Sequence, residues 1–182
     1  YEGQFGLYAT QLRGPLADWD LGAATRGLGD EWETAQVAIK PLPACQLSIA
    51  CIDAAIELHR AHRINVADIA HVQALVPPHA VKIVCEPIAE RRRPGNRYAA
   101  QFSIPFGVAC ALIHGRFGLA EVARYRDADI LALAQKVDYA VDPHTGYPKH
   151  FSGEVIVTLK NGTRIAHREQ RSEEHTSELQ SH

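Results

Sequence analysis

Lys40 stands between a predicted strand and the clearest predicted helix of the sequence, where a cation can take part in chemistry. The strand spans residues 34–40 (TAQVAIK), and Pro41 and Pro43 stop it before the helix begins. The free N–H groups at a helix start carry positive potential, so a lysine beside them forms a good site for a carboxylate. From spacing alone, a solvated surface lysine is the more common arrangement. Lys40 is therefore either a candidate anion ligand or an ordinary surface lysine.

Two further candidate groups follow in the first turn of that helix. If Cys45 is exposed, its thiol is a candidate nucleophile, and a cysteine-dependent enzyme would be alkylated rapidly at this position. A buried, inert cysteine is the alternative. Gln46 carries an amide that can hydrogen-bond either a ligand or the helix start itself. The helix start thus has several candidate ligand groups, and each of them has a structural alternative.

The common metal and cofactor motifs are missing from the sequence. His59 and His62 have a spacing that suits a metal, but no further ligands stand nearby and an arginine follows each of them. Gly27 and Gly29 lack the third glycine and the preceding strand of a dinucleotide-binding fingerprint. No nucleophile elbow or phosphate-binding glycine loop is present. The residues alone therefore predict neither a metal site nor an organic cofactor.

Charge and hydropathy argue against nucleic acid and membrane as partners. The net charge is −2 and the isoelectric point is about 6.6, and the basic run at residues 91–93 has no interleaved aromatic residues. No apolar run approaches the ~20 residues that span a bilayer. Four cysteines without paired spacing favour a reducing compartment. We therefore expect a cytoplasmic protein.

The pattern of apolar residues predicts an α+β domain, with a mostly antiparallel sheet and helices packed on one face. The clearest elements are a helix over residues 44–62, a buried helix within 99–114 that begins near Pro105, and a hairpin that turns at Asn161-Gly162. The other expected elements are strands at 34–40, 69–76 and 137–141, helices at 15–28, 79–84, 120–125 and 129–135, a charged loop at 86–97 and a turn-rich connection at 142–151.

Length and composition fit one domain at residues 1–170, since 46% of the chain is apolar and 22% is charged. The segment 171–182 (RSEEHTSELQSH) has one leucine and no periodicity that would dock on a core. It resembles a translated sequencing-adapter read-through, and we expect a foreign or disordered tail. The chain begins at Tyr1 and contains no Met, so we also expect it to be part of a longer product.

Five short segments occur along the chain in the order in which one protein family carries them. They are YEGQFGL (1–7), KPLPAC (40–45), AQFSIPF (100–106), GRFGL (115–119), and FSG (151–153) with the hairpin that follows it. Each segment is short, but the ordered set is specific. Over residues 1–170 the chain resembles the C-terminal lid domain of the MmgE/PrpD family.

The resemblance implies an enzyme that loosens a bond at a carbon next to a carboxylate without metal or organic cofactor. The family includes 2-methylcitrate dehydratase, cis-aconitate decarboxylase and iminodisuccinate epimerase. By resemblance, this chain is the substrate-covering domain of a lyase or isomerase acting on a small di- or tricarboxylate, most closely a 2-methylcitrate dehydratase of propionate catabolism. Decarboxylation and epimerisation are the next candidate reactions after dehydration. A non-catalytic anion-binding module is the alternative from a different class.

The resemblance also implies roles for single residues. Lys40 matches a lid lysine that meets a substrate carboxylate, which reverses the preference for a surface lysine. Cys45 stands where some decarboxylase-like members have histidine, and Phe106 stands where tyrosine is common, so their reaction is not assumed for this chain. The polar residues of the same segments either line the cleft or only cap helices. The expected substrate-binding residues are Lys40, Cys45, Gln46, Gln101, Ser103 and Phe106.

The catalytic groups themselves are expected outside this sequence. The resemblance places them in an all-helical domain before Tyr1, so no catalytic residue is expected within the chain. It also implies a homodimer of the full-length protein. We expect the chain alone to be inactive, and we expect an exposed apolar patch where the helical domain would pack.

Overall fold

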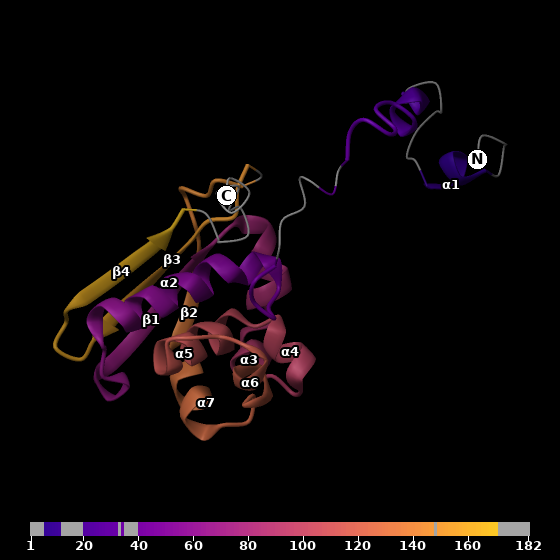
Figure 1. Ribbon diagram of the computed structural model, residues 1–182. Coiled ribbons are helices and arrows are strands. Elements are labelled where there is room, and N and C mark those ends of the chain that lie inside the picture. Colours follow the sequence, from indigo (N-terminus) through magenta and orange to yellow (C-terminus); the bar gives the residue numbers. More distant parts are fainter. Residues whose placement is uncertain (1–5, 12–19, 33, 35–39, 148, 171–182) are drawn as a thin grey trace. The chain divides into compact units, whose positions relative to one another are not determined.

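The computed structural model describes residues 6–11, 20–32, 34, 40–147 and 149–170, which fall into two units, Tyr1–Val37 and Ala38–His182 (Figure 1). The first unit holds α1 (Leu7–Gln11) and the 3-10 turn η2 (Leu21–Ala24), and neither contains a buried residue. The second unit holds the sheet, the longer helices and the hydrophobic core.

The helix expected over residues 15–28 is not a continuous helix in its described part. Residues 12–19 lie outside the described chain, and the rest contains only η2 followed by turns. Gly27 and Gly29 both have positive φ, which ends helical geometry there as the sequence predicts. The strand expected over 34–40 falls mostly outside the described residues.

The second unit is built on a four-stranded sheet in the order β2-β1-β3-β4 (Figure 1). Strand β1 (Ile69–Val76) pairs in parallel with β2 (Val137–Val141) and antiparallel with β3 (Gly153–Leu159), which pairs antiparallel with β4 (Arg164–Glu169). The predicted α+β class is therefore confirmed. The sheet, however, is mixed rather than mostly antiparallel. The helical crossover of residues 77–136 brings the chain back beside β1, so that β2 runs in the same direction as β1.

A row of apolar side chains crosses the sheet and sets its register. Val137, Val72, Val157 and Ile165 stand opposite one another in turn, and the first three of them are fully buried. Side chains alternate between the two faces of a strand, so this row lies on the covered face. The hairpin closes at Gly162, which has φ of 86° and whose N–H donates to the Leu159 carbonyl at 2.9 Å, as the Asn-Gly signal predicts.

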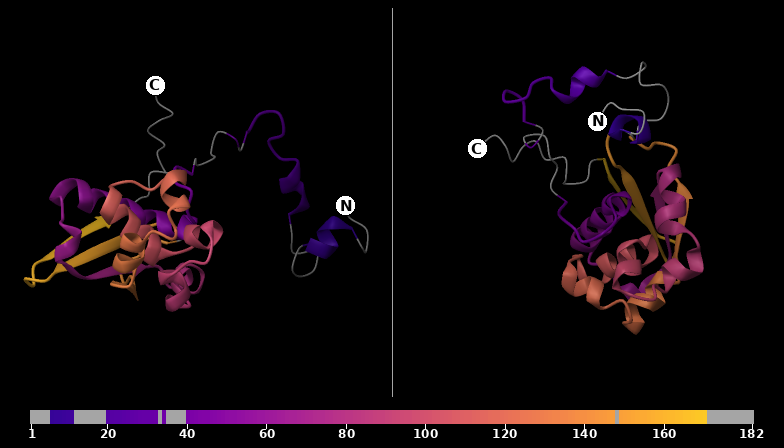
Figure 2. Two further views of the ribbon diagram at one scale, coloured as in Figure 1. Left: turned by 90° about the horizontal axis from the view of Figure 1, so that it is seen from below. Right: turned by 90° about the vertical axis from the view of Figure 1, so that its right-hand side faces the viewer.

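Two helices cover this face of the sheet. Helix α2 (Gln46–His62) contacts β1, β3 and β4, and α5 (Ile104–His114) lies beside α2 and contacts β2. Figure 2 shows α2 lying along the strands from two further directions. Both helices agree with the expected ranges, including the start of α5 at Pro105. Their length and apolar composition made them predictable without tertiary information.

One expected loop contains regular structure. The charged segment 86–97 holds a short helix, α3 (Ile88–Arg92), and α4 (Arg97–Gln101) begins at its end. Arg92 donates from Nε and Nη2 to the Val137 carbonyl and also pairs with Asp138. The charges in this segment predict a solvated loop, but in the structure Arg92 binds the segment to β2.

The remaining elements are short. They are η4 (Val66–Asp68), η5 (Pro78–Ala80), the π-helical turn η6 (Val81–Cys85), α6 (Leu119–Ala123) and α7 (Ala128–Ala134). The helices expected near residues 79–84, 120–125 and 129–135 are confirmed within a few residues. The turn-rich connection expected at 142–151 is also present, between β2 and β3.

The close approach of β3 to α2 gives a stability prediction. A Cβ added at Gly153 would lie 2.7 Å from Cys51 Sγ and 3.1 Å from the Cys51 backbone nitrogen. We expect Gly153→Ala to lower the free energy of unfolding by about 1–3 kcal/mol, measured by urea denaturation, because the buried contact has no free space. Adding Cys51→Ala should recover part of the loss. A Gly153→Ala variant as stable as the wild type would contradict this packing.

Candidate functional site

The start of α2 meets the end of α4. The backbone N–H of Cys45, the N-cap residue of α2, donates to the carbonyl of Gln101, the last residue of α4, at 2.7 Å. Cys45, Gln46 and Gln101 are all half-buried. The structure therefore brings the neighbouring candidates Cys45 and Gln46 together with Gln101, which is distant in the sequence, at one junction of two helices.

No side chain caps the backbone N–H groups in the first turn of α2. Neither a side-chain cap nor an acidic residue is present at its start. By contrast, Asn96 caps α4 through the Ala99 N–H at 2.8 Å, and Ser103 caps α5 through the Phe106 N–H at 3.0 Å. An uncapped helix start presents N–H groups and positive potential to an incoming anion. Lys40 lies five residues before Cys45 in the chain and is exposed.

Two of the candidates lie in the interior of the domain. Ser103 is buried, and its hydroxyl donates to the Arg91 carbonyl at 2.5 Å while it accepts the capping bond at the start of α5. Phe106 has 0% exposure and packs edge-to-face against Phe117 with ring centroids 6.2 Å apart. Ser103 thus makes the capping bond that was the alternative to a ligand contact, and Phe106 belongs to the core of this domain.

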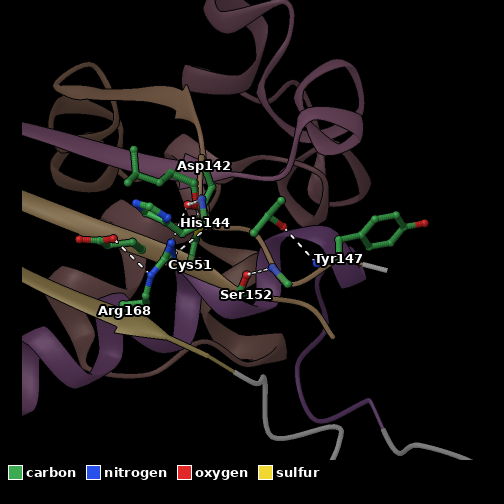
Figure 3. A network of polar contacts seen from close by, with 10 residues as sticks. Cys51, Asp142, His144, Tyr147, Ser152 and Arg168 are labelled. Carbon is green, nitrogen blue, oxygen red and sulfur yellow. Dashed lines mark hydrogen bonds and ion pairs between the residues drawn. The ribbon is translucent and has the colours of Figure 1, made fainter. Parts of the chain in front are cut away.

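A largely buried ion pair joins Asp142, in the β2–β3 connection, to Arg168 of β4 (Figure 3). The Asp142 side chain is fully buried, and Arg168 donates to it from Nη1 at 3.0 Å and from Nη2 at 2.5 Å. The His144 N–H also donates to Asp142 at 2.9 Å, and Glu154 stands 3.6 Å from Arg168 Nε. The carboxylate is therefore held by a two-pronged contact and a backbone donor, which is a rigid arrangement.

This pair was not anticipated from the sequence. The turn-rich connection after β2 was predicted, but Arg168 is 26 residues away from Asp142 and no local pattern links them. The one available signal was an acidic residue at the start of a turn, whose side chain often accepts a backbone N–H two residues later, as Asp142 does from His144. That signal predicts the turn and not the arginine.

A groove of about 490 Å³ runs between α2 and the segment that leads into α6. Within it Arg116 Nε donates to Glu121 at 2.7 Å, and the Gly118 N–H donates to the other carboxylate oxygen at 2.9 Å. Burial raises the pKa of Glu121, but these two donors outweigh it, so the pKa is held below its usual value. The groove is lined by Leu42, Asp53, Ile56, Glu57, Arg60, Arg116, Phe117, Gly118, Glu121 and Glu169.

Metal ligation and membrane insertion have no structural counterpart among the residues that the structure describes. No three His, Cys, Asp or Glu side chains come together there as a set that would hold a metal ion. His59 instead uses Nδ1 in a 2.8 Å contact with the Leu112 carbonyl. None of the helices in the same ranges has the length and apolar character needed to cross a bilayer.

The fold defines a class of protein: an α+β domain with a mixed four-stranded sheet and two long helices on one face. The comparison with protein families identifies the class more closely, because residues 42–179 match the model of the MmgE/PrpD C-terminal domain. The chain belongs to the MmgE/PrpD family, as a C-terminal domain of that family. A search of the curated proteins found no match.

The Glu121 carboxylate gives a prediction about pH. Its folded pKa lies below the ordinary value, so the ionised form stabilises the fold; this stabilisation is complete above about pH 5 and is lost as pH falls through the folded pKa. We expect Glu121→Gln to be less stable than wild type at pH 6, with the difference shrinking below about pH 4, in urea denaturation at each pH.

Glu57→Gln is the matched control, because Glu57 and its partner Arg60 are both substantially exposed. It should change stability little at any pH, since exposed pairs contribute little. A constant difference between Glu121→Gln and wild type from pH 3 to pH 6 would contradict the role given to the Glu121 charge.

Proposed function

We propose that this domain covers the active site of a cofactor-independent lyase or isomerase, and that the start of α2 holds a carboxylate of a small di- or tricarboxylate substrate. The observation that carries the proposal is the open first turn of α2, which has no side-chain cap and no acidic residue, with exposed Lys40 before it. Membership of the MmgE/PrpD family supports the reaction class, since the family includes dehydratases and related enzymes.

The chemistry explains why such a site is useful. When a proton leaves a carbon next to a carboxylate, negative charge develops on the carboxylate oxygens. Preorganised N–H groups and a lysine stabilise this charge without reorganising during the reaction. In this proposal Lys40 and the first-turn N–H groups hold the carboxylate, and Gln46 and Gln101 orient it from the same junction. The domain supplies binding and charge stabilisation, whereas the base comes from elsewhere.

We propose dehydration of a 2-methylcitrate-like substrate as the leading reaction and the cytoplasm as its place. Decarboxylation and epimerisation remain the competing reactions, because Cys45 and Phe106 depart from the pattern of related enzymes. Ser103 and Phe106 enter the proposal through the support they give to α5, since both are buried. Cys45 contributes its backbone to the α2–α4 junction, and its half-buried thiol lies beside the proposed carboxylate.

The base and the other catalytic groups are proposed to lie on a helical domain outside this sequence, in a homodimeric enzyme. Large apolar side chains exposed near the α2–α4 junction support a covering role. Tyr98 on α4 is 71% exposed and its ring contacts Phe102, and Leu119 at the start of α6 is 76% exposed. Helices α4 and α6 contact each other. Exposed apolar groups of this size mark contact surfaces.

Replacing the lysine tests the proposal directly. In the enzyme that contains both this domain and a helical domain, we expect Lys40→Ala to lower kcat/KM at least 10²-fold, about 2.7 kcal/mol of transition-state stabilisation, on 2-methylcitrate, cis-aconitate or iminodisuccinate. The control is Lys160→Ala, because Lys160 is also exposed but lies in the turn between β3 and β4. No turnover of any of the three, or an active Lys40→Ala enzyme, would remove the proposed function.

The 182-residue chain by itself gives a second test. We expect no turnover of these three compounds, because the proposal assigns carboxylate binding to this domain and the base to another. Product formation would be followed by proton NMR with the purified chain at high concentration. Dehydratase or decarboxylase activity from this chain alone would contradict the assignment of catalysis to another domain.

A further inference from the structure

The ion pair between Asp142 and Arg168 lies against the helix that carries the proposed carboxylate site. Figure 3 shows Cys51 of α2 beside the pair, and the charges of both residues act on the Cys51 thiol, whose pKa burial raises far above its ordinary value. Cys51 Sγ also contacts the Leu75 carbonyl of β1 at 3.5 Å. The pair is therefore placed where α2 meets the sheet.

The connection that Asp142 begins also ends against α2. Within it the Gly146 N–H donates to Ser152 Oγ at 3.0 Å, so the turn is closed on itself just before β3. The next residue, Gly153, touches Ala50 and Cys51 so closely that no Cβ would fit. Asp142 thus fixes one end of a closed turn whose other end supports the second turn of α2.

The distance from this support to the proposed site is short. Gln46 is the first residue of α2 and Cys51 the sixth, so the two are separated by about 7.5 Å along the helix axis. An α-helix is stiff over this length, so a shift of the helix at Cys51 moves its first turn as well. A displacement of about 1 Å at a binding site is enough to reduce activity substantially.

We propose that Asp142 and Arg168 are positioning residues: their two-pronged ion pair fixes α2 on the sheet and so determines where its open first turn meets the substrate carboxylate. The inference rests on the proposed function for its substrate. The ion pair suits this task because its geometry is set by two N–H donors, which hold the turn that Asp142 begins in a fixed place relative to β4. It contacts no substrate itself.

The experiment separates positioning from stability by removing both charges together. The variants are made in a Glu154→Gln background, with Glu154→Gln alone as the reference, because Glu154 also pairs with Arg168 at 3.6 Å. In Asp142→Leu combined with Arg168→Met, no buried charge of this group is then left without a partner, and such replacements commonly preserve stability. The readouts are the Kd of tricarballylate, a tricarboxylate without a hydroxyl group to eliminate, and amide hydrogen exchange of α2 and α5. Both are measured by NMR on the 182-residue chain, with the unfolding midpoint measured alongside.

We expect the double variant to bind tricarballylate at least ten-fold more weakly and to exchange its first α2 amides at least ten-fold faster, while the α5 amides and the unfolding midpoint change little. Arg168→Lys keeps the charge but loses the two-pronged contact, so it should fall between wild type and the double variant. This single change also decides the question if the double variant does not fold. Wild-type binding and exchange in either folded variant would overturn the proposal.

The matched control is the pair of Arg92 and Asp138, which joins α3 to β2, whereas α2 packs on β1, β3, β4 and α5. Arg92→Met with Asp138→Asn should leave the α2 amides and the Kd unchanged; an equal effect would show that any lost ion pair loosens α2 and would overturn the proposal. If wild type does not bind tricarballylate, or Lys40→Ala binds it equally well, the proposed function fails instead. The exchange rates then still decide whether the pair positions α2.

Discussion

The packing of α2 on the sheet is the interaction on which the rest of the domain depends. One face of this helix buries apolar side chains against β1, β3 and β4, and its side contacts α5. The approach is so close at Gly153 that only a glycine fits. Burial of apolar area is the main favourable term in folding, and here it holds α2 against the sheet. The first turn of α2 in the proposed site depends on that packing.

Polar side chains satisfy the backbone N–H groups at some helix starts of the domain and not at others. Asn96 and Ser103 satisfy the starts of α4 and α5, and Glu121 joins Arg116 to the Gly118 backbone. The start of α2 receives no such side chain. The starts of α3 and α7 also lack a side-chain cap, but α2 is the longest of the described helices. Its start connects the fold to the proposed carboxylate chemistry.

The elements that followed from the sequence are those with a local cause. Apolar periodicity predicted α2 and α5, Pro105 marked the start of α5, and Asn161-Gly162 predicted the β3–β4 turn. The segment that became α3 was read as a loop because its arginines looked solvated, whereas Arg92 binds the Val137 carbonyl from a distant strand. Charge in a sequence does not reveal whether a partner exists elsewhere in the chain.

The sequence by itself determined the family, the α+β class, the positions of the long helices and the hairpin, because each depends on residues that are neighbours in the chain. Only the tertiary structure decided the parallel pairing of β1 with β2, the meeting of Cys45 with Gln101, and the pair of Asp142 with Arg168. It also placed Phe106 in the core rather than at a surface. These outcomes depend on contacts between distant segments, whose free energy becomes available only when the whole core is packed.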